Sequence, residues 1–148
     1  MSNEPDAITL QVVSWNEASN ALGSLRRTVF IEEQGVPRDV EWDGRDAECR
    51  HVLALRGDQP VGCGRLMPDG KIGRMAVLAS ERGRGVGAAV LQRLVELARE
   101  CGFERVYVHA QQHAAPFYSR AGFVPRGATF EEAGIPHTTM HLALTTPA

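Results

Sequence analysis

Three glycines at alternate positions, two of them preceded by arginine, form the segment Arg82-Gly83-Arg84-Gly85-Val86-Gly87. An apolar, strand-like segment at 74–78 comes before it, and a helical pattern at 88–101 comes after it. Glycine lets the backbone turn tightly, and the exposed N–H groups at the start of a helix lie at the positive end of its dipole. Arg82 and Arg84 add cationic side chains for further phosphate oxygens. The segment therefore predicts a binding site for a phosphate-bearing cofactor.

Three kinds of phosphate-binding loop can be compared with this segment. A Walker loop ends in Gly-Lys-Ser/Thr, and the chain has no Lys-Ser or Lys-Thr pair. A dinucleotide loop matches G-x-G-x-x-A at 83–88, but that fold needs an acidic residue at the end of the next strand. The next predicted strand, 105–110, ends without one, and too little chain remains for the rest of such a sheet. Coenzyme A is the third candidate, and the rest of the chain favours it.

The elements that must position this loop follow from periodicity and turn residues. Alternating or apolar runs predict strands at 8–13, 51–55, 61–67, 71–78 and 105–110. Helical spacing predicts helices from a cap at Ser14 or Asn16 to about Glu33, at 88–101 and at about 113–121. A closing hairpin is predicted from strands at 123–131 and 137–144. Together these elements indicate an α+β domain with a mixed sheet of about seven strands and helices on both faces.

Two motifs within residues 74–123 resemble the central region of the GNAT superfamily of N-acyltransferases. The first family motif, Arg/Gln-x-x-Gly-x-Gly/Ala between a strand and a helix, is matched by Arg82, Gly85 and Gly87. The second, Asn-x-x-Ala-x-x-(Phe/Leu)-Tyr-x-x-x-Gly-Phe, is matched by residues 111–123, except that Gln111 replaces the Asn. Both motifs occur in order and at the family spacing. With its flanking strands, the resemblance covers roughly residues 8–145.

A narrower likeness lies upstream. Residues 27–34, Arg-Thr-Val-Phe-Ile-Glu-Glu-Gln, residues 41–46, Glu-Trp-Asp-Gly-Arg-Asp, and then His51 resemble the ElaA-like branch of the superfamily. The resemblance implies one N-acetyltransferase domain over 1–148, with a core at about 8–145. It also implies a mostly antiparallel seven-stranded sheet in which two central strands splay apart.

The splayed strands imply a place for coenzyme A. In the family, the pantetheine arm enters between them and pairs with backbone groups, as an added strand would. The pyrophosphate then lies on the N–H groups of residues 82–87. Gln111 meets the cofactor by family position. The positions implied for the arm are Met75, Ala76 and Val77. Met75 and Val77 are expected to contact it through their backbones.

The implied activity is acetyl transfer from acetyl-CoA to a primary amine, by direct transfer in a ternary complex. Tyr118 occupies the family's general-acid position, and a phenol stays protonated at neutral pH. The backbone N–H of Val77 or of a neighbour is expected to stabilise the oxyanion. No metal is needed. The alternative is a non-catalytic acyl-CoA-binding sensor or regulatory domain, which keeps the loop and lacks the chemistry.

The general base is the open part of this site. Many family members carry a Glu on the strand corresponding to 71–78, and this chain has no carboxylate there. Glu33, at the end of the first predicted helix, is the first candidate base, and His51 is the second. His109 and His113 are interpreted as structural, because the family positions there seldom do chemistry. Trp42 is expected either to line the acceptor pocket or to cap the core.

Composition excludes several other classes. The chain has 148 residues, a formal charge of −2 and 43% hydrophobic residues, which fits a single soluble domain and disfavours a nucleic-acid binder. No apolar run approaches the length of a membrane span, and the acidic N-terminus is unlike a signal peptide, so a cytoplasmic location is expected. Clustered acids hint at a cationic small-molecule amine as acceptor: Glu32, Glu33, Glu41, Asp43 and Asp46. A homodimer is also compatible with the family.

Overall fold

The computed structural model describes residues 7–132 and 134–144 and contains seven strands in two hydrogen-bonded groups. The first group has the antiparallel order β1-β2-β3-β4, with the bounds Ile8–Val13, Arg50–Arg56, Gln59–Leu66 and Ile72–Val77. The second has the antiparallel order β5-β7-β6, with β5 at Arg105–Gln111, β7 at Ile135–Ala143 and β6 at Val124–Glu132. The predicted α+β class and strand number are confirmed.

The two groups meet between β4 and β5. A single parallel bridge joins Lys71 to Tyr107, and the Tyr107 N–H donates to the Gly70 carbonyl at 3.0 Å. Beyond this bridge β4 and β5 form no ladder with each other among the described residues. The predicted splay of the central strands is therefore confirmed, and it opens toward the C-terminal ends of both strands.

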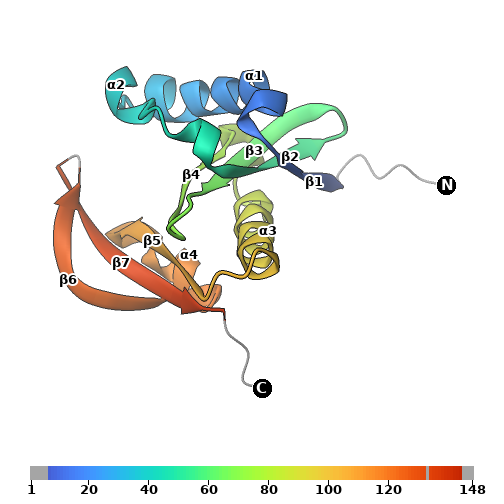
Figure 1. The fold of residues 1–148 in the computed structure, drawn as a ribbon. Helices are drawn as coiled ribbons and strands as arrows, with labels where there is room; N and C mark the ends of the chain where they lie inside the picture. Colours follow the sequence, from blue (N-terminus) through green and yellow to red (C-terminus); the bar gives the residue numbers. More distant parts are fainter. Residues whose placement is uncertain (1–6, 133, 145–148) are drawn as a thin grey trace.

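Helices cover both faces of the first strand group, β1–β4 (Figure 1). Helix α1, Trp15–Arg26, lies on one face, and α3, Val86–Glu100, lies on the other. Short helices α2, Arg38–Glu41, and α4, Ala115–Arg120, complete the set. Ser14 caps α1 in a reciprocal capping box with Glu17, with bonds of 2.8 and 3.1 Å.

The predicted first helix is longer than its regular α-helical part. After Arg26 the backbone continues as a π-helix over Arg27–Glu33, so the predicted end at Glu33 holds while the hydrogen-bonding pattern changes. The segment 34–46, predicted as loop, contains α2 and leads into a 3-10 turn at Asp46–Glu48. Local breakers such as Gly35 and Pro37 indicated a loop here, but four residues after Pro37 still complete a helical turn.

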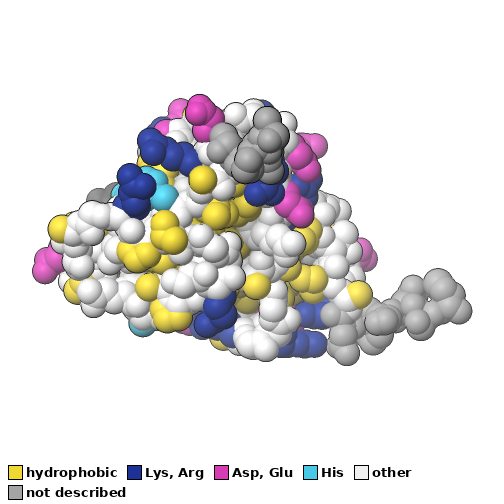
Figure 2. All heavy atoms as spheres, turned by 90° about the horizontal axis from the view of Figure 1, so that it is seen from below, with side chains coloured by type: hydrophobic (Ala, Val, Ile, Leu, Met, Phe, Trp, Pro, Cys, Tyr) yellow, Lys and Arg dark blue, Asp and Glu magenta, His cyan; other side chains and the backbone are white. Residues whose placement is uncertain are grey.

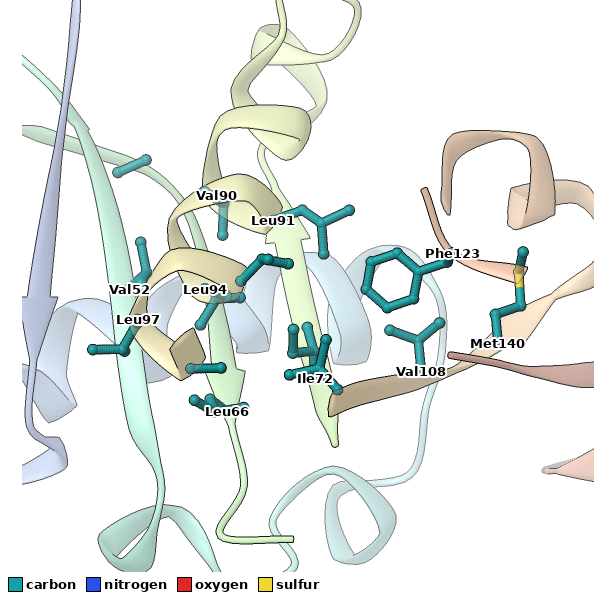
Figure 3. Packing of buried hydrophobic residues seen from close by; sticks show 14 of the residues in the cluster. Val52, Leu66, Ile72, Val90, Leu91, Leu94, Leu97, Val108, Phe123 and Met140 are labelled. Carbon is teal, nitrogen blue, oxygen red and sulfur yellow. The ribbon is translucent and has the colours of Figure 1, made fainter. Parts of the chain in front are cut away.

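The larger hydrophobic core lies between α3 and both strand groups (Figure 3). Its α3 face contributes Val90, Leu91 and Leu94, which are essentially inaccessible to solvent. They pack with Val52 and Leu66 of the first group. From the second group and the chain leading into it come Val108, Phe123 and Met140. This shared core holds the two groups together at the side of the splay that α3 covers.

One glycine sets how closely α3 approaches the sheet. A Cβ added at Gly64 of β3 would lie 2.7 Å from Leu94 Cδ1 and 3.0 Å from Val90 Cγ1. We expect Gly64→Ala to lower the free energy of unfolding by about 1–3 kcal/mol, because the packed helix must shift. Chemical denaturation measures this. Gly73→Ala, whose Cβ meets nothing within 4 Å, is the control and should change it by less than about 0.5 kcal/mol; equal effects would contradict the steric explanation.

Charged side chains are dispersed on the face of the molecule seen from below (Figure 2). On the face seen from below (Figure 2), the described Lys and Arg side chains stand in small groups separated by neutral and hydrophobic atoms, without a broad basic area. Within the described residues, no helix has the length and apolar character needed to cross a membrane.

Candidate active site

The glycine loop joins β4 to α3 and presents open backbone donors. Gly83 and Gly85 adopt positive φ angles of 77° and 84°, and Gly85 is the N-cap residue of α3. The N–H groups of Gly83, Gly85, Val86 and Gly87 have no acceptor among the described residues. Nothing lies within 4 Å of a Cβ built at Gly83 or Gly85. The loop therefore offers unpaired donors at a helix N-terminus, an arrangement suited to phosphate oxygens.

The third glycine connects the two sequence motifs. A Cβ built on Gly87 would lie 3.7 Å from the ring of Phe117 and 3.7 Å from Val77 Cγ2. The first turn of α3, the end of β4 and helix α4 therefore converge here. Tyr118 directly follows Phe117, so this contact brings together two motifs that lie about 30 residues apart in sequence.

The end of β4 turns its backbone toward the splay. The Leu78 N–H donates to the Val61 carbonyl at 3.0 Å, and hydrogen-bonded pairs alternate along an antiparallel ladder. Val77, opposite Gly62, therefore directs its own N–H and C=O away from β3. Ala76 is fully buried on the α1 side, whereas Met75 packs against the core around α3. Gln111 ends β5 on the other side of the splay.

Arg82 has partners that its sequence motif did not predict. Its guanidinium forms a two-pronged ion pair with the Glu33 carboxylate, at 2.5 and 2.8 Å, and its Nε donates to the Val77 carbonyl at 3.1 Å. The hydrogen bond from Arg82 lowers the pKa of Glu33. Since a general base needs a raised affinity for protons, this pair disfavours the predicted role of Glu33. Arg82 is the first residue of the loop, and in this structure its guanidinium is paired with the Glu33 carboxylate.

We expect Glu33→Gln to leave the turnover number within about threefold, because a carboxylate already neutralised by arginine contributes little as a base. Its effect should fall on the cofactor instead, with a lower dissociation constant for acetyl-CoA as Arg82 is released to the pyrophosphate. Steady-state kinetics and calorimetric titration separate the two quantities. A hundredfold loss of turnover with intact binding would restore Glu33 as the base.

Arg84 lies beside another carboxylate. Glu81, which precedes the loop and is nearly buried, accepts from Arg56 at 2.8 and 3.1 Å and lies 3.5 Å from Arg84 Nη1. The bond from Arg56 lowers the pKa of Glu81 and keeps it ionised. Glu81 thus fixes the start of the loop to the β2 strand.

Tyr118 packs its ring and leaves its hydroxyl available. The ring makes edge contacts with Phe117 and Phe123, with centroid distances of 5.1 and 5.8 Å. The hydroxyl makes no hydrogen bond with any described residue. Burial raises the pKa of the phenol, so the group keeps its proton at neutral pH. These properties suit a proton donor.

His51 is a structural residue in this geometry. It is 1% exposed, and its Nε2 lies 2.9 Å from the Asp46 carbonyl, which accepts the proton. Burial lowers the pKa of the imidazole, which stays neutral and hydrogen-bonded. A base must reach the acceptor amine, and the buried position and occupied Nε2 of His51 disfavour that role.

Three of the five acids predicted to attract a cationic acceptor, Glu41, Asp43 and Asp46, are instead paired with arginines. Arg26 is buried and bonds Glu41 and, at 2.5 Å, Asp46. Arg65 bonds Asp46 at 3.0 Å and Asp43 at 2.6 Å, which lowers the pKa of Asp43. Three arginines, with Arg74 as the third, thus match three carboxylates. These three carboxylates therefore offer no net negative charge to an acceptor, and the cationic acceptor stays a prediction.

Trp42 belongs to the same network. Its ring lies 4.8 Å from the Arg26 guanidinium carbon, in a cation–π contact. This contact with a buried arginine favours the second interpretation from sequence, in which Trp42 caps the core. The strand residue Arg74, with a positive φ of 48°, extends this network to β4.

We expect Asp46→Ala to lower the free energy of unfolding by about 3–5 kcal/mol, because it leaves Arg26 and Arg65 buried without their shared carboxylate. Thermal or chemical denaturation tests this. The control Glu48→Ala breaks a solvent-exposed pair with Arg45 and should have an effect too small to resolve. Similar losses in both variants would contradict the importance of burial.

His109, which was interpreted from sequence as structural, belongs to a group of side chains on β5, β6 and β7. His109 of β5 lies with Nδ1 at 2.9 Å from Glu132 Oε1 of β6, and its ring meets Phe130 edge-on at 5.0 Å. His137 of β7 stacks on Phe130 at 5.9 Å. The alternation of apolar residues along β5 could have indicated which face His109 occupies. Val106, Val108 and Ala110 are buried, so the residues between them turn to the other face of the sheet.

Comparison with known proteins places this geometry in context. The model of the acetyltransferase (GNAT) domain matches residues 19–144. The uncharacterized N-acetyltransferase YjcF of Bacillus subtilis is 39% identical over 120 residues, covering 78% of this chain and 86% of that protein. An acyl-CoA N-acyltransferase from Pseudomonas aeruginosa superposes with a TM-score of 0.78 at 31% identity, covering 93% of this chain and 99% of that one.

The ElaA protein of Escherichia coli is similar in both sequence and structure. Over 128 residues the two sequences are 34% identical, which covers 81% of this chain and 84% of ElaA. The ElaA crystal structure superposes with a TM-score of 0.80 at 32% identity, covering 91% of this chain and 99% of that one.

Proposed function

The chain belongs to the GNAT acetyltransferase family, within its ElaA-like branch, and we propose that it transfers an acetyl group from acetyl-CoA to a small-molecule primary amine. The observation that carries this proposal is the loop 82–87, whose unpaired N–H groups open at the start of α3 beside the splay of β4 and β5. A pyrophosphate and an extended amide chain are the ligand parts that such a loop and such a gap accept.

In this proposal the cofactor lies along the splay. The N–H groups of residues 83–87 hold the pyrophosphate, with Arg82 and Arg84 at its sides. The pantetheine arm pairs with the free edge of β4 at Met75 and Val77, beside Ala76, while Gln111 approaches it from β5. The thioester then lies near Val77, whose N–H is turned toward the gap.

The chemistry proposed is direct attack by the amine on the thioester carbonyl. The Val77 N–H donates to the oxyanion as it forms. The Tyr118 hydroxyl donates its proton to the departing sulfur. Its raised pKa and unengaged hydroxyl support this role. Nothing in the described site has the arrangement of an activated nucleophile: Cys63 is buried and burial raises its pKa to about 12, which disfavours an acyl-enzyme.

The proposal is tested by incubating the protein with acetyl-CoA and a panel of primary amines: spermidine, 2-phenylethylamine, L-lysine, L-phenylalanine and a lysine-containing peptide. Release of free coenzyme A thiol and the mass of the acetylated amine are measured. Turnover of at least one amine is expected. Tight acetyl-CoA binding without turnover across a broadened panel would indicate the sensor function instead, and no binding would overturn both.

A further inference from the structure

We propose that His109, positioned by Glu132, is the general base that removes the proton from the acceptor amine. This rests on the proposed function and supplies the base that the sequence left open. The dyad consists of the imidazole of His109 on β5 and the carboxylate of Glu132 on β6, joined at 2.9 Å.

The position of His109 in the fold suits this role. Tyr107 is bridged to Lys71, the residue before β4, and His109 follows two residues later, where β5 begins to separate from β4. Val108, between them, is buried in the core around α3. Because side chains alternate along a strand, Tyr107 and His109 turn to the opposite face of the sheet, away from α3. An amine that approaches over this face would meet the thioester from the side opposite the core, with His109 beside the gap.

The hydrogen bond to Glu132 fixes which nitrogen of His109 is basic. An ionised carboxylate only accepts hydrogen bonds, and the pKa of Glu132 is lowered by its bond with His109, despite partial burial. The proton of the neutral imidazole therefore lies on Nδ1, and Nε2 keeps its lone pair. Nε2 has no hydrogen-bond partner among the described residues. An oriented imidazole with a free lone pair is what a general base requires.

The surrounding groups explain why this histidine differs from its neighbour. His137 also faces Glu132, with Nε2 at 3.9 Å from Oε2, but it is 6% exposed and its Nδ1 donates to the Ile135 carbonyl at 2.7 Å. The ring of Phe130 lies against both histidines and provides an apolar wall. The side chain of His109 is 26% exposed, so it is the one of the pair that solvent and an acceptor reach.

Other charged groups around the dyad are accounted for. Lys71, before β4, interacts electrostatically with Glu132, and burial lowers the pKa of its amine. Tyr107 lies 5.8 Å from the His109 ring and donates its hydroxyl proton to Asp69 at 2.5 Å. Neither Lys71 nor Asp69 bonds the His109 ring within the described structure, so the carboxylate of Glu132 is its direct partner.

The proposed transfer moves one proton to His109 and one proton from Tyr118. The neutral amine forms the N–C bond with the thioester carbonyl, and one N–H proton passes to His109 Nε2. The C–S bond then breaks, and the sulfur takes the phenolic proton of Tyr118. The imidazolium releases its proton through solvent and the phenolate takes one up, which restores both groups. The products are the N-acetylated amine and coenzyme A.

Steady-state kinetics test the proposal, with acetyl-CoA and the panel amine that the wild type acetylates fastest. His109→Gln is expected to lower the turnover number by about 10²–10⁴-fold. Its acetyl-CoA dissociation constant should stay within about twofold. Glu132→Gln should lower turnover by about tenfold, because it weakens the orientation of the ring. His141→Gln, on the same sheet face and stacked on Tyr107 at 6.0 Å, is the matched control with near wild-type rates.

A second readout does not depend on the acceptor. Nitrogen-15 spectra of the imidazole side chains should show neutral His109 protonated on Nδ1. Protonation on Nε2, or a His109→Gln variant that keeps wild-type turnover, would overturn the inference while leaving the proposed function intact. Absence of wild-type turnover with every amine would overturn the two together.

Discussion

Tyr118→Phe is expected to lower the turnover number by about 10²–10⁴-fold, the range that positioned proton transfer contributes, while the dissociation constant of acetyl-CoA stays within about twofold. The substitution removes one oxygen and keeps the ring contacts with Phe117 and Phe123. Without a donor, the thiolate must leave unprotonated, and this affects the transition state more than the bound ground state.

The pH dependence sharpens this expectation. Burial raises the pKa of the Tyr118 phenol from its ordinary value of 10.0, so the donor is protonated throughout the neutral range and only loses its proton above it. Wild-type activity should therefore show no decline that reports Tyr118 below about pH 10. Steady-state rates and calorimetric titration of both proteins give the comparison.

The control is Tyr107→Phe, which removes the only other phenol in the chain and should leave turnover within about threefold. Its hydroxyl is engaged by Asp69 and is not part of the proposed transfer step. If Tyr118→Phe keeps wild-type turnover, the leaving sulfur is protonated by another group, and water in the open gap becomes the first alternative.

The second large effect is expected from Gly85→Glu, which should raise the dissociation constant of acetyl-CoA at least about 100-fold, or by about 2.7 kcal/mol. The space around Gly85 is open, since nothing lies within 4 Å of its Cβ position. A glutamate side chain would therefore extend into the place proposed for the pyrophosphate and repel it. Calorimetric titration with acetyl-CoA, beside NADH as a negative control, measures the effect.

Gly102→Glu is a matched control at the other end of the same helix. Its φ of 85° is nearly that of Gly85 at 84°, and its Cβ position is also open. Both variants therefore introduce the same charge and a similar left-handed strain, but only one lies in the proposed phosphate loop. Equal losses of binding would indicate a general defect of α3, and unchanged binding in Gly85→Glu would contradict the loop assignment.

The candidate site divides into parts that local sequence predicts and parts that it does not. Gly85 was predictable because a left-handed N-cap before a helix requires glycine, and this requirement is local. Tyr118 was predictable because its place in the second motif is fixed by spacing along one helix. The base was not predictable in this way. The pairing of Arg82 with Glu33 joins residues 49 positions apart, and His109 lies 23 positions from Glu132.

The sequence by itself determined the order of strands and helices, the glycine loop and the family, because each depends on periodicity, turn residues or a contiguous motif. Only the tertiary structure decided the partners of the charged side chains. It paired three arginines with the acids of 41–46, bonded His51 to a backbone carbonyl, and set His109 against Glu132. The reason is physical: an ionisable group takes its role from the charges and burial around it, and strand register and helix packing bring these from distant parts of the chain.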